Sequence, residues 1–355
     1  MDTLEKTILS QYRINLETYL ELEDFALEKI ENLVNDERFF TLEISHRTKS
    51  VSSLEDKLNR KLGKYKTLYN ITDLCGFRII TYFSDTVDEI ANKLSGIFVI
   101  DRKNSIDKRA SLQANEFGYM SVHYVCSLKP EDLKEHPEFT DIHFEIQIRS
   151  ILQHAWAEIE HDLGYKSEFG IPRPIRREFS RVAGLLEIAD NQFIELRESV
   201  NKYESHVKER ISEDEANDIL LDKVSLWEYI QLNRVFLDLL GQIKDSTGID
   251  IEIIKPDNYL ELLYFFKLET LGDLSDFIER NKDSALRAIL EKIKEHELDI
   301  TTSNMILRFL CRAELTDNGY SANDIRQFVS IAIADKDRVE RYVNSLIGYS
   351  LPSQQ

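Results

Sequence analysis

At 355 residues the chain is longer than one ordinary domain, and division by roughly 150 residues per domain predicts about two folding units. Hydrophobic residues make up 42% of the chain and charged residues 31%, with only 12 Gly and 6 Pro, which excludes a disordered, collagen-like or linker-rich protein. The net charge of −19 excludes indiscriminate binding to nucleic acid or anionic lipid, because such binding draws on a basic surface.

No stretch approaches the ~20 apolar residues that cross a bilayer, and the N-terminal segment lacks the basic and then apolar order of a signal peptide. Cys75, Cys126 and Cys311 are far apart and form no CxxC pair. This spacing indicates neither a disulfide framework nor a zinc knuckle. We therefore expect a cytoplasmic protein that makes no membrane contact.

The first 210 residues alternate between helix-like and strand-like patterns. The predicted helices lie at 5–38 (one helix or two, with a break near Glu23-Asp24), 50–61, 87–97, 151–165 and 174–210. The predicted strands lie at 39–45, 76–83, 97–102, 119–128 and 141–149. Ser50, Ser52 or Ser53 would cap the second of these helices. The pattern predicts an α/β (α+β) fold, with a mixed sheet of about five strands flanked by helices.

The acidic segment 212–218 (SEDEAND) marks the predicted boundary between a first domain, 1–211, and a second, 212–355. The second domain is mostly helical in pattern, with one strand candidate at 248–254. A self-contained helical domain and a regulatory or oligomerising segment that forms a homo-oligomer are the two alternatives for this region. We expect the second, because catalysis would not require the additional helical mass.

Residues 47–66 form a basic island in this acidic chain. Seven Lys or Arg residues stand against Glu55 and Asp56, which gives a local charge of +5. A solvated helix face is the ordinary explanation of such a run. An isolated positive segment in an acidic protein nevertheless favours a phosphate-rich ligand.

The segment 73–78 (DLCGFR) lies where a loop enters the buried strand predicted at 76–83. A carboxylate at this position can hold Mg²⁺, Gly76 permits close backbone approach, and Arg78 can grip a phosphate with two hydrogen bonds. A capping aspartate and a surface arginine are the alternative explanation of so short a pattern.

Tyr119, Ser121 and His123 occupy alternate positions of the strand predicted at 119–128. Alternate residues of a strand face the same side, so a ring, a hydroxyl and an imidazole stand in one row. A flat nucleotide base could stack there. Packing of this sheet face beneath a helix is the alternative.

Glu145, Gln147 and Arg149 also alternate, while the two isoleucines between them are expected to enter the core. Placing a carboxylate, an amide and a guanidinium on one face of an otherwise apolar strand costs free energy unless the face is wet or liganded. A second Mg²⁺ ligand at Glu145 is the economical explanation.

His154, Glu158 and His161 lie one helical turn apart on the helix predicted at 151–165. Their spacing resembles that of a metal site, and a polar helix face that covers the cleft is the alternative. The dipeptide His161-Asp162 also occurs in metal phosphohydrolases. No suitable partner histidines precede it, so we reject that interpretation.

Five segments in order resemble the synthetase domain of RelA/SpoT-type alarmone synthetases, in particular the small single-domain kind: RTKS (47–50), DLCGFRIIT (73–81), FGYMSVH (117–123), EIQIRS (145–150) and HAWAEIEHDLGYK (154–166). The resemblance covers about residues 1–210 and implies a nucleotidyltransferase-like sheet. It implies an Mg²⁺-dependent enzyme of the stringent response that transfers the β,γ-pyrophosphate of ATP to the 3′-hydroxyl of GDP or GTP. The products would be AMP and the alarmones (p)ppGpp.

The resemblance also assigns roles to individual residues. Asp73 and Glu145 match the catalytic, Mg²⁺-associated carboxylates of the family. The residues that match its ATP-binding cations are Arg47, Lys49, Arg78 and, less closely, Lys57. Those that match its acceptor site are Tyr119, on which the base would stack, and His123 and Gln147 beside it.

Two departures from the family pattern leave the acceptor open. Guanosine-directed members carry a basic, proline-containing approach to the Gly-Tyr pair, whereas this chain has DKRASLQANEFGY at 107–119. Lys108 and Arg109 are the candidates for that role. The FGYxSVHYV form also resembles toxin-type members that use adenosine nucleotides or the 3′ end of tRNA. An inactive nucleotide sensor or partner-binding module is a third alternative, against which the presence of both carboxylates argues.

Overall fold

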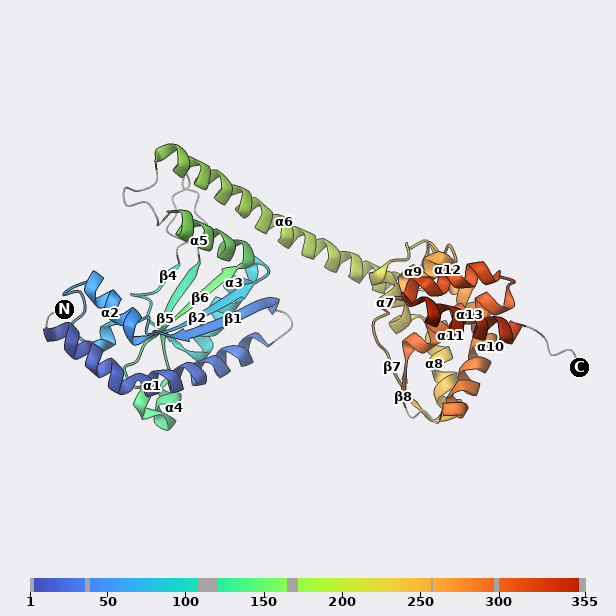
Figure 1. Cartoon of the computed structure of the whole chain (residues 1–355), viewed down its shortest axis with the longest axis horizontal. Coiled ribbons are helices and arrows are strands. Elements are labelled where there is room, and N and C mark those ends of the chain that lie inside the picture. Colours follow the sequence, from blue (N-terminus) through green and yellow to red (C-terminus); the bar gives the residue numbers. More distant parts are fainter. Residues whose placement is uncertain are drawn as a thin grey trace, which may run out of the picture. The chain divides into compact units, whose positions relative to one another are not determined.

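A computed structural model describes residues 3–35, 39–107, 121–164, 172–256, 258–296 and 300–350 of the chain. The chain forms two compact units, residues 1–197 and 198–355 (Figure 1). The dividing point falls inside one long helix, α6 (Arg173–Ser212).

The first unit is built around a six-stranded mixed sheet. Its strands are β1 (Thr41–Thr48), β2 (Cys75–Thr81), β3 (Val99–Ile100), β4 (Ile106–Asp107), β5 (Val122–Ser127) and β6 (Phe144–Ser150). The order across the sheet is β1-β2-β6-β5-β3, with β4 also paired to β5. The pair β2/β6 is parallel and the other pairs are antiparallel. The predicted mixed sheet flanked by helices is confirmed.

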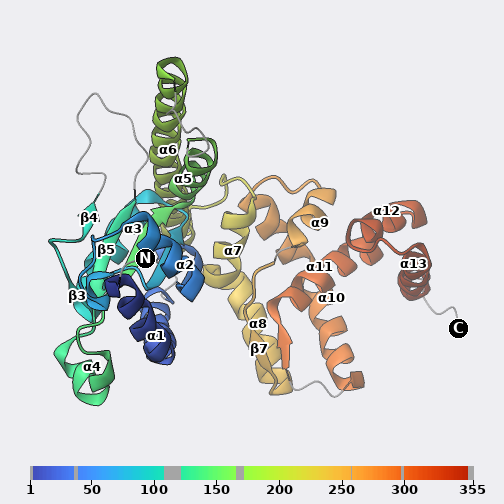
Figure 2. The same cartoon turned by 60° about the vertical axis from the view of Figure 1, so that its left-hand side comes forward.

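Helices α1 (Thr3–Val34) and α3 (Ser84–Ile97) contact each other and the strands, and they share one buried core with the sheet (Figure 2). Alternate residues of β2 and β6 enter this core: Phe77, Ile79, Ile146 and Ile148, each at most 2% exposed. Because side chains alternate along a strand, the residues between them must face the other side of the sheet. That second face carries the polar residues of the predicted site.

The described part of the first unit also contains the α-helices α2 (Val51–Arg60), α4 (Pro130–Glu135) and α5 (Ile151–Gly164). Ser50 is the N-cap of α2, and its hydroxyl accepts a hydrogen bond from the backbone N–H of Ser53 at 3.2 Å. This bond satisfies one of the donors that a helix leaves free in its first turn. The cap therefore fixes where α2 begins, immediately after the loop that carries Lys49.

The N-terminal segment forms one helix, α1, without a break at Glu23-Asp24. Glu23 is only 7% exposed, and its carboxylate pairs with the Nδ1 atom of His46 on β1 at 2.6 Å. A buried charge is tolerated when it is paired and hydrogen-bonded. The polar interruption in the sequence is therefore a contact between α1 and the sheet.

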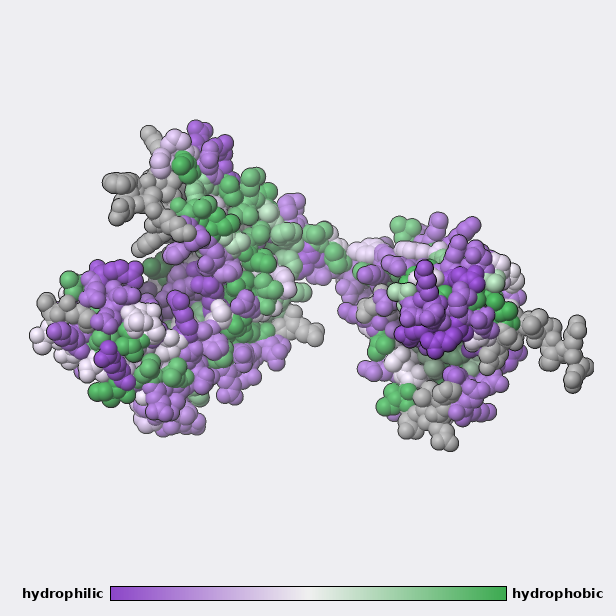
Figure 3. Space-filling view, in the orientation of Figure 1, coloured by the Kyte–Doolittle hydropathy of each residue, from purple (hydrophilic) through white to green (hydrophobic). Residues whose placement is uncertain are grey.

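Exposed hydrophobic residues gather along α5 and the part of α6 in the first unit (Figure 3). They are Ile159, Leu163, Ile175, Val182, Leu185, Ile188, Phe193 and Leu196. Beneath them a small cluster forms, in which Trp156 packs against Phe179 and Ala183. Two polar contacts hold α6 in this unit: the Ser150 hydroxyl donates to Asp190 at 2.9 Å, and Arg197 pairs with Asp85.

The second unit is mostly helical, as predicted. Its helices are the end of α6, α7 (Lys223–Leu232), α8 (Arg234–Thr247), α9 (Tyr259–Phe265), α10 (Leu271–His296), α11 (Ser303–Asp317), α12 (Ala322–Ala332) and α13 (Lys336–Ser350). The strand expected at 248–254 appears as β7 (Asp250–Glu252), which pairs in parallel with β8 (Ile300–Thr302). One hydrophobic core holds the unit together, and it includes Val207 and Ile211 from α6.

None of the described helices combines the length and the apolar run that a membrane span requires.

Candidate active site

The polar face of the sheet brings residues from four strands into one row. In the parallel pair β2/β6, Gly76 lies beside Glu145 and Arg78 beside Gln147. The antiparallel neighbours place Arg47 of β1 opposite Gly76, and His123 of β5 opposite Gln147. Residues more than 90 positions apart in the sequence therefore share one surface.

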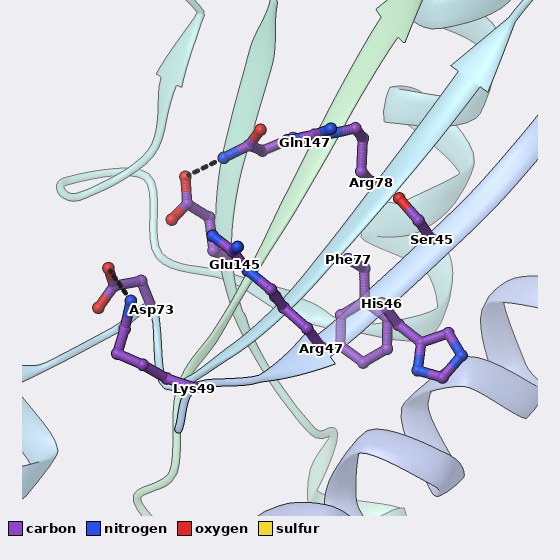
Figure 4. A pocket seen from close by; sticks show the side chains of 10 residues that line it. Ser45, His46, Arg47, Lys49, Asp73, Phe77, Arg78, Glu145 and Gln147 are labelled. Carbon is purple, nitrogen blue, oxygen red and sulfur yellow. Dashed lines mark hydrogen bonds and ion pairs between the residues drawn. The ribbon is translucent and has the colours of Figure 1, made fainter. Parts of the chain in front are cut away.

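A cavity of about 240 Å³ opens on this surface (Figure 4). Six of the residues predicted for the site line it: Arg47, Lys49, Asp73, Arg78, Glu145 and Gln147. Gly76 lines it too, and a Cβ atom built at that position would meet no atom within 4 Å. The missing side chain thus leaves room between Arg47 and Glu145.

Asp73 lies in the turn before β2 and is held by two lysines from other elements. The Nζ atom of Lys49, which follows β1, is 3.5 Å from its carboxylate, and Lys57 of α2 forms a hydrogen-bonded ion pair with it. Burial opposes the charge of Asp73, but the Lys57 and Lys49 ammonium groups outweigh that effect and hold its pKa below the usual value. Asp73 is therefore ionised at neutral pH.

Glu145 is the centre of a second polar group. It accepts hydrogen bonds from His123 Nδ1 at 2.9 Å and from Gln147 Nε2 at 3.3 Å. With Nδ1 protonated, the other nitrogen of a neutral His123 ring accepts from the Ser121 hydroxyl, 2.5 Å away. Burial raises the pKa of Glu145, but His123 and Gln147 outweigh it and hold the pKa below the usual value.

The remaining cations lie farther along the same strands. Arg149 donates to the side-chain amide oxygen (Oε1) of Gln147 at 2.8 Å, and Arg78 lies 3.4 Å from the Glu158 carboxylate of α5. Burial and the neighbouring Arg78 charge lower the pKa of Arg149. Among the described residues, the Nε atom of Arg149 has no hydrogen-bond partner although it is buried. The part of this face around Arg78 and Arg149 is therefore rich in positive charge and suited to an anion.

The structure tests the predicted face of β6 directly. Glu145, Gln147 and Arg149 are linked side by side by hydrogen bonds, while Ile146 and Ile148 are fully buried. This part of the strand prediction is confirmed. His123 and Lys57 are not among the residues that line the cavity. Each contacts a lining residue instead: His123 bonds to Glu145, and Lys57 pairs with Asp73.

Three of the residues predicted to contact the acceptor, Lys108, Arg109 and Tyr119, lie outside the described residues. The possible metal site on α5 is not formed by the described residues. His154 Nδ1 lies 3.7 Å from Glu158, and no group of three or more His, Cys, Asp or Glu side chains in the described ranges could hold a metal ion.

Sequence reasoning missed Ser45 and the direct contacts Lys57–Asp73 and His123–Glu145. Ser45 precedes Arg47 by two residues on β1, so the two-residue period of a strand could have found it. The two contacts required the strand pairing and the position of α2.

Part of the chain is similar to known proteins. Residues 46–169 match the family model described as the region found in RelA/SpoT proteins. Two curated relatives from Bacillus subtilis, each called a GTP pyrophosphokinase, are 26% identical to this chain. YjbM aligns over 45% of this chain and 73% of its own length, and YwaC over 57% and 97%.

Solved structures similar to this chain include the small alarmone synthetases 1 and 2 of Bacillus subtilis. They are 24% and 23% identical, each with a TM-score of 0.43, and the matches cover 54% and 53% of this chain and 99% of each neighbour. The matched region 46–169 contains nearly all the residues that line the cavity. The chain therefore carries a region that matches the RelA/SpoT family model and is similar to GTP pyrophosphokinases.

Proposed function

We propose that this cavity transfers the β,γ-pyrophosphate of ATP to the 3′-hydroxyl of GDP or GTP, which forms (p)ppGpp and releases AMP. One observation carries the proposal: three cations, Arg47, Lys49 and Arg78, and two ionised carboxylates, Asp73 and Glu145, line one cavity. Carboxylates among cations on an open sheet face suit a ligand that brings both phosphates and a divalent cation.

The cations would bind the donor. Arg47 and Arg78 present guanidinium groups, whose planar donors match phosphate oxygens with two hydrogen bonds each. Lys49 is a point charge beside Asp73, and its side chain is only 16% exposed. Transfer of this kind depends on in-line positioning and charge neutralisation more than on covalent steps. Holding the ATP phosphates is accordingly the main task of these three residues.

Mg²⁺ fits the donor set on this face. Asp73 and Glu145 offer hard carboxylate oxygens, both ionised at neutral pH, and Mg²⁺ is usually held by one or two carboxylates together with substrate phosphates. We assign both residues as its ligands. When bound, the ion would neutralise charge on the transferred phosphates.

The acceptor would lie beside β5 and β6. His123 and Gln147 both hydrogen-bond to Glu145, which fixes the orientation of its carboxylate. Such preorganisation lets the carboxylate meet an acceptor hydroxyl without rearrangement. Tyr119, two residues before Ser121 in the sequence, would stack on the base, and Lys108 and Arg109 would hold acceptor phosphates. The names of the two curated relatives support a guanosine acceptor.

A labelling experiment tests the acceptor. The full chain is incubated with Mg²⁺, ATP labelled at the γ-phosphate and, in separate reactions, GDP, GTP, unlabelled ATP or bulk tRNA. We expect label in a product of GDP or GTP, with AMP formed in equal amount. Labelled tRNA or a labelled adenosine product would replace the guanosine acceptor by one of the toxin-type alternatives. No transfer to any acceptor would favour the inactive nucleotide-binding module.

A further inference from the structure

The second unit contains a cavity that pyrophosphate transfer does not use. It lies among α9, α11, α12 and α13 and has a volume of about 490 Å³. Sites for small organic ligands typically enclose about 300–1,000 Å³. The cavity is therefore large enough for a small molecule and too large to be an ordinary packing defect.

The floor of the cavity is apolar. It is formed by five buried residues, each at most 7% exposed: Leu262, Cys311, Leu315, Val329 and Leu346. Such a surface does not hold ordered water well, because water needs two to four polar partners. An apolar group would fill it more favourably.

All charged residues that line the cavity are arginines: Arg308, Arg312 and Arg338. No acidic residue in the described part of the chain is among its lining residues. The positive charge of Arg308 lies near the hydroxyl of Tyr259, and the Arg312 guanidinium lies 5.7 Å from the centre of the Phe309 ring. The described lining therefore carries three positive charges and no negative charge, in contrast to the net charge of −19 of the whole chain.

Arg338, on α13, is the cation available to a ligand. Its backbone N–H bonds to Asp335 at 2.8 Å, but within the described ranges its guanidinium forms no ion pair or hydrogen bond. A guanidinium binds a carboxylate or a phosphate through two parallel hydrogen bonds. An anionic group at the rim and an apolar body on the floor would thus satisfy both parts of the cavity.

We propose that this cavity binds a small amphipathic anion, a hydrocarbon body that carries a single carboxylate or phosphate group. The anionic group lies between Arg308 and Arg338, and the hydrocarbon lies on the floor formed by α9, α11, α12 and α13. This site is independent of the transfer chemistry, since none of its lining residues belongs to the first unit.

Calorimetry on the full chain tests the proposal with four probes below their micellar concentrations: decanoate, decyl phosphate, decanol and inorganic phosphate. We expect saturable binding of decanoate or decyl phosphate at one site per chain. The probe that binds more tightly identifies whether the site prefers a carboxylate or a phosphate. Decanol and inorganic phosphate should bind at least tenfold more weakly, because each lacks one half of the ligand. Absence of saturable binding by both anions, or equal binding of decanol, would overturn the proposal.

Variants locate the site. Arg338→Gln should weaken binding of the tighter anion by at least about tenfold, since hydrogen bonds to charged groups contribute that much affinity. Ala332→Phe, at an exposed position of the cavity wall, should do the same by filling the space. Arg341→Gln is the matched control, because it removes the same charge from α13 at a residue outside the cavity lining and should bind as the wild type does. Wild-type affinity in Arg338→Gln, or an equal loss in Arg341→Gln, would contradict the site.

Discussion

Single side chains set the charge of the cavity on the polar face of the sheet. Asp73 is neutralised by Lys49 and Lys57, which arrive from a loop and from a helix, and Glu145 is held by His123 from the neighbouring strand. Both carboxylates stay ionised although they are largely buried, because charged or hydrogen-bonding groups surround them. Removing one such partner should therefore disturb substrate binding more than folding.

The variant Lys57→Gln tests this expectation for the binding of ATP, the proposed donor. The Lys57 side chain is only 15% exposed and contacts Asp73, so we expect the KM for ATP to rise roughly tenfold or more, the usual weight of a hydrogen bond to a charged group. Lys61→Gln is the control, because Lys61 follows the last residue of α2 and is exposed. Steady-state kinetics at saturating GTP measures both. An equal KM for ATP in the two variants would remove Lys57 from the site.

Tyr119 tests the acceptor side. If its ring stacks on the acceptor base, Tyr119→Ala should raise the KM of the acceptor far more than that of ATP, since stacking contributes roughly 1–3 kcal/mol per base. Tyr119→Phe keeps the ring and should be nearly silent. A Phe variant as impaired as the Ala variant would show that the hydroxyl, and not the ring, is required.

The three cysteines should not react in the folded protein. All are buried and free, and burial raises the pKa of the Cys75 thiol to about 12 and raises those of Cys126 and Cys311 as well. The reactive thiolate is therefore scarce at pH 8. Titration with a chromogenic disulfide should detect almost no thiol in native protein and three per chain in guanidinium chloride. Rapid reaction of any cysteine without denaturant would show that its surroundings open.

Strand periodicity in the sequence predicted which side chains share a face, but not which of them contact each other. The alternation of β6 was enough to place Glu145, Gln147 and Arg149 on one face. It could not predict that His123 bonds to Glu145, because that contact depends on the register in which β5 pairs with β6. Register is a property of two strands, and one strand's sequence does not contain it.

Among the secondary-structure elements, α2 links the basic island to the cavity. The helix begins at the Ser50 cap and carries Lys57 in its last turn, so its start fixes where Lys57 reaches Asp73. The basic run was visible in the sequence. Only the packing of α2 shows that Lys57 contacts Asp73 whereas Lys61 is exposed to solvent.

Ser50→Ala should loosen this helix. Loss of an N-cap hydroxyl typically costs about 1 kcal/mol, so amide hydrogens in the first turn of α2 should exchange about fivefold faster. Ser52→Ala is the control, because the N-cap bond to the Ser53 N–H comes from Ser50 alone. Hydrogen–deuterium exchange resolved to residues 50–60 measures the difference. Equal exchange in the two variants would show that the cap does not stabilise α2.

The sequence placed most strands correctly but shifted β1. The expected strand was 39–45, whereas β1 spans Thr41–Thr48. Arg47 and Thr48 pair with Gly76 and Cys75, so hydrogen bonds to β2 extend β1 into a polar segment that has little strand pattern of its own. Tertiary pairing overrode local preference here.

In the chain as a whole, the division between the two compact units falls inside a helix. The acidic segment 212–218 suggested a boundary at 211, while the compact units divide after Arg197, inside α6. The composition of the segment 212–218 indicates where α6 ends. The unit to which each part of α6 belongs depends on the hydrophobic core against which that part packs. Val207 and Ile211 contribute to the core of the second unit, so a cut after residue 211 would leave them exposed.

A fragment of residues 1–197 tests whether the second unit controls the first. We expect it to fold, because Asp190 and Arg197 keep their contacts with Ser150 and Asp85. Circular dichroism checks the fold. We further expect its basal turnover, or its oligomeric state by light scattering, to differ from that of the full chain. Unchanged turnover and an unaltered oligomeric state together would leave the second unit as a self-contained helical domain.

Turnover of the Glu145→Gln variant tests whether Asp73 and Glu145 serve pyrophosphate transfer in one cavity. AMP and labelled (p)ppGpp are followed with ATP, GTP and saturating Mg²⁺, beside the wild type and Glu160→Gln, an exposed control on α5. We predict that Glu145→Gln is slower by at least ~10²-fold, the usual effect of removing a preorganised electrostatic group, while Glu160→Gln matches the wild type. Wild-type turnover by Glu145→Gln would contradict the proposed site.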